Sequence, residues 1–514
     1  MRIGHALCLG LGLLASGPVA AQSITVALKA DIRGTNPGVN RDDDTDAVTL
    51  HMVEGLVAYR EGGTVGPLLA EKVDVSEDGR TYSFRLRQGV KFHNGTEMTS
   101  ADVLWSWNRF MDPKTEWRCL SEFDGRGAVK VEAVEAPDPH TVTMKIDKPN
   151  ALFLDSLART DCGMAAVLHK DSLNPDGSWK APVGTGPFKF GEWKRGQEII
   201  LSRFDGYVSP PGDKRDGFTG QKKALVQEAR FLVVPDSSAV KAGLEAARID
   251  IAEIVDSDIP DLEKSKNVKV LLGSTGGRHA VIFQTTDPVF KSAKMRQAIA
   301  AALDINQIVE VAASGRVKPN NSTIHSRSPY YSAVQARGVT YDPGKAKQLL
   351  TEAGYKGERI KITTNNRKSA PSFNIAVVIQ AMLQQVGVPA DIDVVEWATH
   401  MDRFLKGNYQ IMVHSYSSRF DPALSFEHFT GPKSSQPRKV WDNPEVQQLL
   451  EKAAATSDEG TRQKMFDELH TRMLDEMPLI ILFNQLDAWA TSARVEGFTP
   501  NEGRARVWGV GIKN

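Results

Sequence analysis

Residues 360–416 read IKITTNNRKSAPSFNIAVVIQAMLQQVGVPADIDVVEWATHMDRFLKGNYQIMVHSY and decide the fold. Short apolar runs predict strands, and the apolar residues between them recur at helical spacing. The predicted elements are, in order, a strand at 360–364, a helix at 375–386, a strand at 390–396, a helix at 399–407 and a strand at 409–414. Because strands that alternate with helices form parallel sheets with right-handed crossovers, this stretch predicts an α/β fold.

Two polar segments follow the first and third of these strands, where open α/β sheets bind their ligands. The segments are Asn365-Asn366-Arg367-Lys368-Ser369 and Ser417-Ser418-Arg419-Phe420-Asp421-Pro422. Neither has a helix or strand pattern, so both are candidate walls of a pocket, although solvated loops would look the same. We take Asn366, Arg367, Ser417, Ser418, Arg419 and Asp421 as candidate ligand contacts, together with the neighbouring Tyr416 and Trp397.

Further predicted elements flank this stretch on its N-terminal side. Asp342 followed by Pro343 has the pattern of a helix start, and Gly354 ends that helix. Thr99 with Asp102, and Thr399 with Asp402, have the spacing of a capping box. In the first half we expect a helix at 47–57, and strands at 24–28, 82–86, 129–134 and 141–146.

The length and charge of the chain limit the classes of protein that it can belong to. At roughly 100–200 residues per domain, 514 residues predict two to four domains. The 63 basic residues balance 63 acidic ones, which argues against a nucleic-acid binder and against a protein of anionic membrane surfaces. Three cysteines are too few for a disulfide scaffold or a zinc cluster.

The first 21 residues have the layout of a secretory signal peptide. Arg2 precedes an apolar run, Ala6 to Leu14, and small residues up to Ala21 follow Pro18. A buried N-terminal helix is the alternative, but the glycines and proline make it a poor one. We therefore expect a cleaved signal peptide, a mature chain beginning at Gln22 and a periplasmic protein. No later stretch has the roughly 20 continuous apolar residues of a membrane span.

Two cysteines, Cys119 and Cys162, remain once the first 21 residues are removed. In an oxidising compartment two thiols favour a disulfide over two separate buried thiols.

The sequence lacks several common catalytic and metal-binding motifs. The sequence has no Gly-x-Ser-x-Gly elbow, no His-Glu-x-x-His and no phosphate-binding loop. Asp42, Asp44 and Asp46 begin like a calcium loop but lack its later glycine and glutamate, so we interpret them as a solvated helix start. We expect no metal site and no cofactor.

Several longer motifs resemble the family 5 extracellular solute-binding proteins, the peptide, nickel and opine receptors of ABC importers. They occur in the family's order along nearly the whole mature chain. The motifs are SEDGRTYSFRLRQGVKFHNG at 76–95, TSADV at 99–103, PVGTGPF at 182–188, DPVF at 287–290 with MRQAI at 295–299, and YDPGKAKQLLTEAGY at 341–355.

The resemblance implies a two-lobed periplasmic-binding-protein fold, type II, in its large variant with an extra subdomain. By this similarity, lobe I comprises residues 22–270 and 485–514, and lobe II comprises 271–484, with a hinge near Gly273 and Asn484. It also implies a monomer that closes around a small solute and delivers it to membrane permease subunits, without chemistry on the solute. A secreted hydrolase, or a chaperone-like or signalling receptor on the same fold, are the alternatives.

The resemblance also bears on the ligand. Peptide-binding members carry an aspartate before this Asp-Pro, which anchors the peptide's amino group, and here Ser418 holds that place and Arg419 follows it. A guanidinium suits a carboxylate or phosphate, so we expect an anionic ligand such as an opine or a sugar conjugate, with peptides as the family default. Two alternatives stay open: Arg419 pairs with Asp421 or another carboxylate, or a shifted alignment makes Asp421 the amine anchor.

Overall fold

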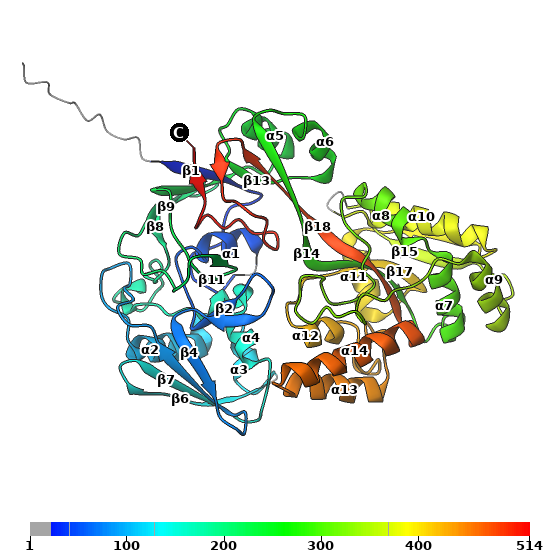
Figure 1. Ribbon diagram of the computed structural model, residues 1–514, viewed down its shortest axis with the longest axis horizontal. Helices are drawn as coiled ribbons and strands as arrows, with labels where there is room; N and C mark the ends of the chain where they lie inside the picture. Colours follow the sequence, from blue (N-terminus) through cyan, green and yellow to red (C-terminus); the bar gives the residue numbers. More distant parts are fainter. Residues whose placement is uncertain (1–21, 41, 128, 368–369, 514) are drawn as a thin grey trace, which may run out of the picture.

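The computed structural model describes residues 22–40, 42–127, 129–367 and 370–513, so the expected signal peptide lies outside the described residues. The chain forms two lobes joined by two long strands, β14 (Val268–Phe283) and β18 (Leu479–Ser492) (Figure 1). Among the helices described, none has the length and apolar character needed to cross a membrane.

The second lobe contains the predicted strand–helix–strand–helix–strand unit. Its strands are β15 (Ile360–Thr364), β16 (Ala390–Val394) and β17 (Ile411–Tyr416), and its helices are α7 (Ala293–Ala302), α8 (Ile305–Ala313), α9 (Pro343–Glu352), α10 (Ser372–Gln385), α11 (Trp397–Lys406), α12 (Pro422–Glu427), α13 (Pro444–Ala455) and α14 (Glu459–Glu476). β15 pairs in parallel with β16 and with β17, which confirms the parallel sheet. Asp342 is the N-cap of α9 and accepts from the Lys345 amide at 2.8 Å, as predicted.

Two local predictions in this lobe were wrong. Helix α11 begins at Trp397 with Glu396 as its N-cap, and Asp402 pairs with Lys406 one turn later, so Thr399 is not a cap. The third strand begins at Ile411, because Gly407 ends α11 in a left-handed conformation and a short link follows before pairing starts. β17 therefore extends to Tyr416, directly before the polar segment.

One sheet runs through both lobes. Its strand order is β16-β15-β17-β14-β18-β13-β1-β12-β9-β8. β14 and β18 are antiparallel, and their register shifts between Ser274 and Arg278, opposite Leu486 and Asn484. The backbone between the lobes is thus irregular at Thr275, Gly276 and Gly277.

The first lobe forms the other half of this sheet. Its elements are β1 (Ser23–Leu28), β8 (Phe188–Lys194), β9 (Glu198–Arg203), β12 (Glu228–Val233), β13 (Ile251–Glu253), α1 (Asp43–Thr49), α5 (Ser237–Glu245) and α6 (Ile259–Leu262), with short pairs β2 (Val57–Tyr59) and β3 (Val65–Pro67), β10 (Arg215–Asp216) and β11 (Thr219–Gly220), and β19 (Val495–Glu496) and β20 (Gly511–Ile512). The predicted helix at 47–57 was wrong in its bounds. Asp42 caps α1 early by accepting from the Thr45 amide at 2.7 Å, and β2 begins at Val57.

A separate four-stranded sheet packs beside the first lobe. It consists of β4 (Ala70–Val75), β5 (Thr81–Leu86), β7 (Thr141–Ile146) and β6 (Val131–Asp138), with helices α2 (Ser100–Met111), α3 (Leu120–Phe123) and α4 (Phe153–Ala158). Its core buries Tyr82, Phe84 and Leu86, as the alternation in the sequence predicted.

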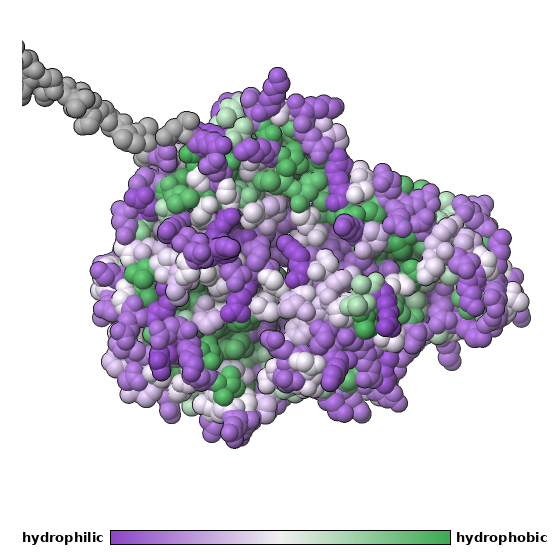
Figure 2. Space-filling view, viewed as in Figure 1, coloured by the Kyte–Doolittle hydropathy of each residue, from purple (hydrophilic) through white to green (hydrophobic). Residues whose placement is uncertain are grey.

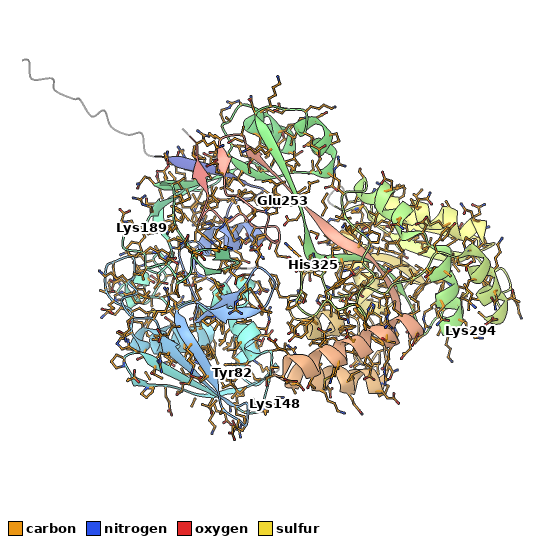
Figure 3. The ribbon with its side chains drawn as sticks, in the orientation of Figure 1. Tyr82, Lys148, Lys189, Glu253, Lys294 and His325 are labelled. Atoms are coloured by element: carbon orange, nitrogen blue, oxygen red, sulfur yellow. A yellow bond between two sulfur atoms is a disulfide. The ribbon has the colours of Figure 1, made fainter. Side chains whose placement is uncertain are left out.

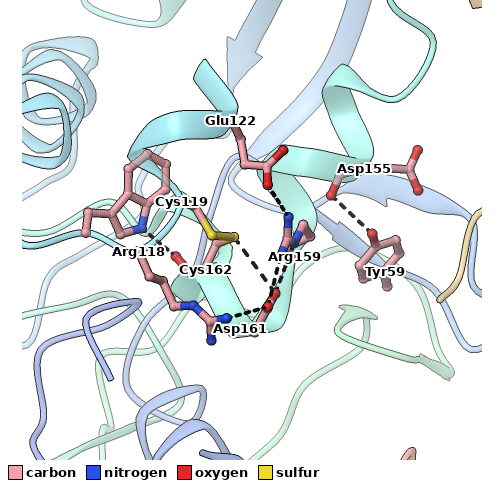
Figure 4. Close-up of a disulfide and its surroundings, with 9 residues drawn as sticks. Tyr59, Arg118, Cys119, Glu122, Asp155, Arg159, Asp161 and Cys162 are labelled. Atoms are coloured by element: carbon pink, nitrogen blue, oxygen red, sulfur yellow. Dashed lines mark hydrogen bonds and ion pairs between the residues drawn. A yellow bond between two sulfur atoms is a disulfide. The ribbon is translucent and has the colours of Figure 1, made fainter. Parts of the chain in front are cut away.

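The disulfide between Cys119 and Cys162 lies in this core and confirms the predicted pairing (Figure 4). The two Cα atoms are 5.7 Å apart. Beside the bridge, Arg159 forms ion pairs with Glu122 at 3.0 Å and with Asp161 at 2.9 Å. The bridge therefore ties the start of α3 to the segment that follows α4.

On the face shown in Figure 2 most of the surface is hydrophilic, and apolar residues gather near α5 and the first half of β14. Leu272 and Val255 belong to this region and are exposed.

Candidate functional site

A cavity lies between the two lobes. Its empty volume is about 380 Å³, a figure that includes the part open to solvent. The first lobe lines it with the loop after β2, which carries Glu61 and Gly63, and with Glu502 near the C-terminus. The second lobe lines it with residues that include His325, Arg327, Arg419 and Phe420. Figure 3 labels His325 in this central region, beside β14.

The predicted segment after β17 contributes directly to this cavity. Arg419 lines it, and its Nη1 donates to Ser417 Oγ at 3.1 Å and to the Ser418 carbonyl at 2.7 Å. Ser418 Oγ donates to the Glu502 carboxylate at 2.8 Å across the lobes. The neighbouring Phe420 ring lies 4.3 Å from the Tyr59 ring of the first lobe. The segment Ser417–Phe420 thus forms part of the contact between the lobes.

Asp421 lies beneath this segment, away from the cavity lining. It is the N-cap of α12 and is buried. Both of its carboxylate oxygens accept from Arg462 Nη2, at 3.0 and 2.9 Å. This geometry gives Asp421 a role in holding α12 and α14 together.

Tyr416 is also buried, in β17. Its ring stacks on His428 at 5.5 Å, and the Arg278 guanidinium lies 5.7 Å from it. Burial raises the pKa of Tyr416 above its usual value. The ring supports the base of the cavity, whose lining does not include it.

The other predicted contacts form a second group at the carboxyl ends of β15 and β16. The Arg367 guanidinium lies 4.5 Å from the Trp397 ring, and Trp397 is 38% exposed. Asn366 is exposed in the same loop, whereas Lys368 and Ser369 lie outside the described residues. Asn366, Arg367 and Trp397 lie at the expected edge of the sheet but do not line the cavity between the lobes.

The sequence did not point to several residues of the site, among them Arg278, Arg327 and Glu502. Arg327 follows a polar stretch without helix or strand pattern, which was the one signal for it. Its Nη2 donates to the Ser274 carbonyl at 2.6 Å and to Glu502 at 3.1 Å. Arg278 lies in the buried half of β14, at a position where an apolar core residue is the usual expectation.

The second lobe brings positive charge to the cavity. Arg278 is fully buried behind the lining and donates to the carbonyls of Gly276 and Ser425 at 3.2 and 3.1 Å. Burial, together with the smaller effect of the Arg419 charge nearby, lowers the pKa of Arg278 to about 9. The first lobe brings carboxylates, since Glu61 and Glu502 line the same cavity and Glu502 pairs with Arg327 of the second lobe. Opposite charges thus face each other across the cavity.

A serine and a histidine meet at this site, but their hydrogen bonds run in the wrong direction for nucleophilic catalysis. His325 Nε2 lies 2.9 Å from Ser274 Oγ, and His325 Nδ1 accepts from the Arg327 amide at 3.0 Å. Since Nδ1 accepts, Nε2 carries the proton of the neutral ring and donates to the serine. A general base would instead need a free Nε2 to take the serine proton. The arrangement suits ligand binding.

Groups of three or more His, Cys, Asp or Glu side chains that could hold a metal ion do not occur within residues 22–40, 42–127, 129–367 and 370–513.

Comparison with known proteins gives matches along almost the whole chain. The family model for bacterial extracellular solute-binding proteins, family 5 (middle region), matches residues 64–436. The dipeptide-binding protein of Escherichia coli K12 is 28% identical over 96% of this chain and 95% of its own length. The solved structure of AgaA from A. tumefaciens R10 in complex with agropinic acid is 27% identical, covers 96% of this chain and 99% of its own, and has a TM-score of 0.69. HbpA2 from Haemophilus parasuis is 25% identical, covers 96% and 100%, and has a TM-score of 0.82.

Proposed function

Because the chain belongs to the bacterial extracellular solute-binding proteins of family 5, we propose that it captures a small solute between its lobes and delivers it to the permease of an ABC importer. The observation that carries the proposal is the cavity, which takes its walls and its charges from both lobes. A ligand there contacts both lobes at once, so its binding favours the closed arrangement.

The lobes of this proposal are residues 22–270 with 485–514, and residues 271–484. We place the hinge near Gly273 and Asn484. The register shift between Ser274 and Arg278 supports this place, because irregular pairing there allows the two long strands to bend with little loss of hydrogen bonding. The protein would act as a monomer in the periplasm after removal of residues 1–21, and sequencing of the exported protein from Gln22 would test the cleavage.

For the ligand we propose a solute with a carboxylate or similar anionic group, held by Arg419 and Arg327. Both guanidinium groups line the cavity, and Ser418 offers no charge to neutralise a buried ammonium. The named ligand of AgaA is an acid, and a dipeptide also ends in a carboxylate. Asn366, Arg367 and Trp397 remain proposed contacts for a ligand that extends beyond the cavity along the sheet edge.

Native mass spectrometry of the purified protein would identify a bound solute, and calorimetry would then test the anchor. Arg419→Ala should weaken binding about 10–150-fold, the range for a lost hydrogen bond to a charged group. Arg359→Ala is the matched control, because Arg359 pairs with Asp391 on the exposed surface. Binding that is indifferent to Arg419→Ala and lost on acetylation of the solute's amine would show that the amine is the anchor.

Hydrolysis is the alternative to test, because a serine and a histidine lie 2.9 Å apart at this site, although the proton on His325 Nε2 leaves that nitrogen unable to act as the base in this arrangement. Recovery of the solute unchanged after prolonged incubation supports the receptor. Multiple turnovers that disappear in Ser274→Ala would support the hydrolase.

A further inference from the structure

Glu502 is a carboxylate of the first lobe that reaches into the second. It lies in the C-terminal segment after β19, and its side chain is only 10% exposed. Its φ of 51° is in the left-handed region, which residues with a side chain rarely adopt. The backbone thus holds an uncommon conformation that directs this carboxylate across the lobes, a kind of strain that clusters at functional sites.

Three donors converge on this single carboxylate. The Gly276 amide donates to its two oxygens at 3.2 and 3.0 Å, Ser418 Oγ donates at 2.8 Å, and Arg327 Nη2 donates at 3.1 Å. A Cβ at position 276 would overlap Ser418 Oγ, so a larger residue there would require the Ser418 hydroxyl to turn away from Glu502. A backbone amide, a hydroxyl and a guanidinium around one carboxylate form the kind of arrangement by which proteins recognise carboxylate ligands.

Two further guanidinium groups lie near Glu502. Arg419 lines the same cavity, and Arg278 is buried behind Gly276. Among the described lining residues, Glu61 is the other carboxylate, and it pairs with Arg506 at 3.0 Å. Burial raises the pKa of Glu502 even though these donors lower it, so its ionised form is held at a cost. Without Glu502, the Gly276 amide, Ser418 and Arg327 would lose the carboxylate to which they donate.

We propose that the Glu502 carboxylate stands in for the carboxylate of the ligand, and that a bound solute displaces it from Gly276, Ser418 and Arg327. This inference rests on the proposed function and specifies the chemistry of the same site, which becomes a carboxylate subsite. It also explains the contact between the lobes, because an internal carboxylate satisfies the buried donors while no solute is bound. A solute without an anionic group could not replace it.

Chemical rescue tests the subsite without knowledge of the solute. Glu502→Gly removes the carboxylate and suits the left-handed backbone, and acetate is the probe that should enter the vacated place. We expect 100 mM sodium acetate to raise the melting temperature of Glu502→Gly by roughly 1–3 °C over the same concentration of sodium chloride, as millimolar binding would. The wild type and Glu496→Ala, an exposed carboxylate near the same terminus, should show no such difference.

A second variant assigns the acetate to this subsite. Arg327→Met combined with Glu502→Gly should lose the acetate effect, because one of the donors is gone. If Glu502→Gly does not fold, Glu502→Ala, which also vacates the place of the carboxylate, provides the same comparison, with calorimetric titration of acetate as the measurement and binding at least tenfold tighter than to the wild type expected. Acetate that affects the variants and the wild type equally, or that still stabilises the double variant, overturns the proposal.

The acetate experiment can fail or succeed independently of the proposed function. Acetate rescue requires no transport and no natural solute, so it can succeed even if no solute co-purifies with the protein. Conversely, a receptor confirmed by native mass spectrometry with no acetate rescue would keep its function and lose this subsite.

Discussion

Replacement of Lys222 by methionine should strongly destabilise the first lobe. Lys222 and Glu54 are both fully buried, and Lys222 Nζ lies 2.8 Å from Glu54 Oε1. Glu54 also accepts from the Tyr207 hydroxyl at 2.8 Å and from Thr185 Oγ1 at 3.0 Å, which holds its carboxylate in place. Methionine has a similar length to lysine but leaves this carboxylate without its closest cation.

The size of the loss follows from this geometry. With an effective dielectric constant near 20, two unit charges 2.8 Å apart attract by about 6 kcal/mol. The net cost of breaking a buried pair is smaller, about 3–5 kcal/mol, because the lost lysine no longer has to be desolvated. The double variant Lys222→Met with Glu54→Gln removes both charges and should recover most of the loss.

The pH dependence gives a second, independent readout. Burial raises the pKa of Glu54, but Lys222 and Arg87 outweigh it, so the folded-state pKa lies below its usual value. In the wild type, the stability from Glu54 is therefore present above about pH 4.5 and is lost as the pH falls. In Lys222→Met we expect burial to prevail and raise this pKa, so that the free energy of unfolding falls with rising pH by up to about 1.4 kcal/mol per pH unit.

Hydrogen exchange at Ile24 and Val26 of β1 is the assay, because it reports the first lobe even if the lobes unfold separately. Lys513→Met is the control, since its pair with Glu496 is exposed. A loss below about 1 kcal/mol with an unchanged pH slope would refute the reasoning, because it would mean that water or Arg87 already compensates Glu54.

Three further predictions concern the bridge, the buried histidines and Asp421. Thiol labelling of the denatured, unreduced mature chain should find none, and loss of the 43-residue closure by Cys119→Ser with Cys162→Ser should cost about 4 kcal/mol in urea unfolding. Burial lowers the pKa of His279 to about 4 and of His414 to about 3. The free energy of unfolding that these neutral histidines contribute is present above pH 6.5 and should fall as the pH drops toward 4. His414→Phe should reduce the difference in unfolding free energy between pH 7 and pH 5. Asp421→Asn should lower the unfolding midpoint while solute affinity, measured by calorimetry on the folded protein, stays within about twofold; a tenfold loss would restore Asp421 as a ligand contact.

The parallel sheet of the second lobe was predictable because its signals are local. Apolar spacing and helix-ending glycines lie within a few residues of one another, and they placed β15 and α9 correctly. The start of α11 was not predictable in this way, since its N-cap, Glu396, makes no side-chain capping hydrogen bond. The predicted helix at 47–57 was wrong in its bounds because Asp42 caps α1 earlier and the helix ends at Thr49, before Gly55, which passes against the Met164 backbone.

The site was predictable only where it follows a strand end. Arg419 and Ser418 follow β17 closely, and the structure has Arg419 in the cavity lining and Ser418 in contact with Glu502. Glu502 and Arg327 are 175 residues apart and meet only because two lobes come together, and no periodic pattern records such a contact. Asp421 shows the opposite failure, since its place in the sequence suited a ligand contact while its partner Arg462 lies on a distant helix.

The serine at position 418 and the glutamate at position 502 are best understood together, because Ser418 donates a hydrogen bond to Glu502. The resemblance predicts an aspartate at the place of Ser418 in the peptide-binding members, and such a carboxylate would lie against Glu502. Two carboxylates in contact in a buried site disfavour each other's ionised forms, so one would tend to hold a proton or move away. In this chain Ser418 instead donates its hydroxyl to Glu502, and Arg327 donates to the same carboxylate. On the alignment used above, the serine at position 418 and the carboxylate at position 502 therefore belong to one arrangement, in which a second carboxylate at this contact is avoided.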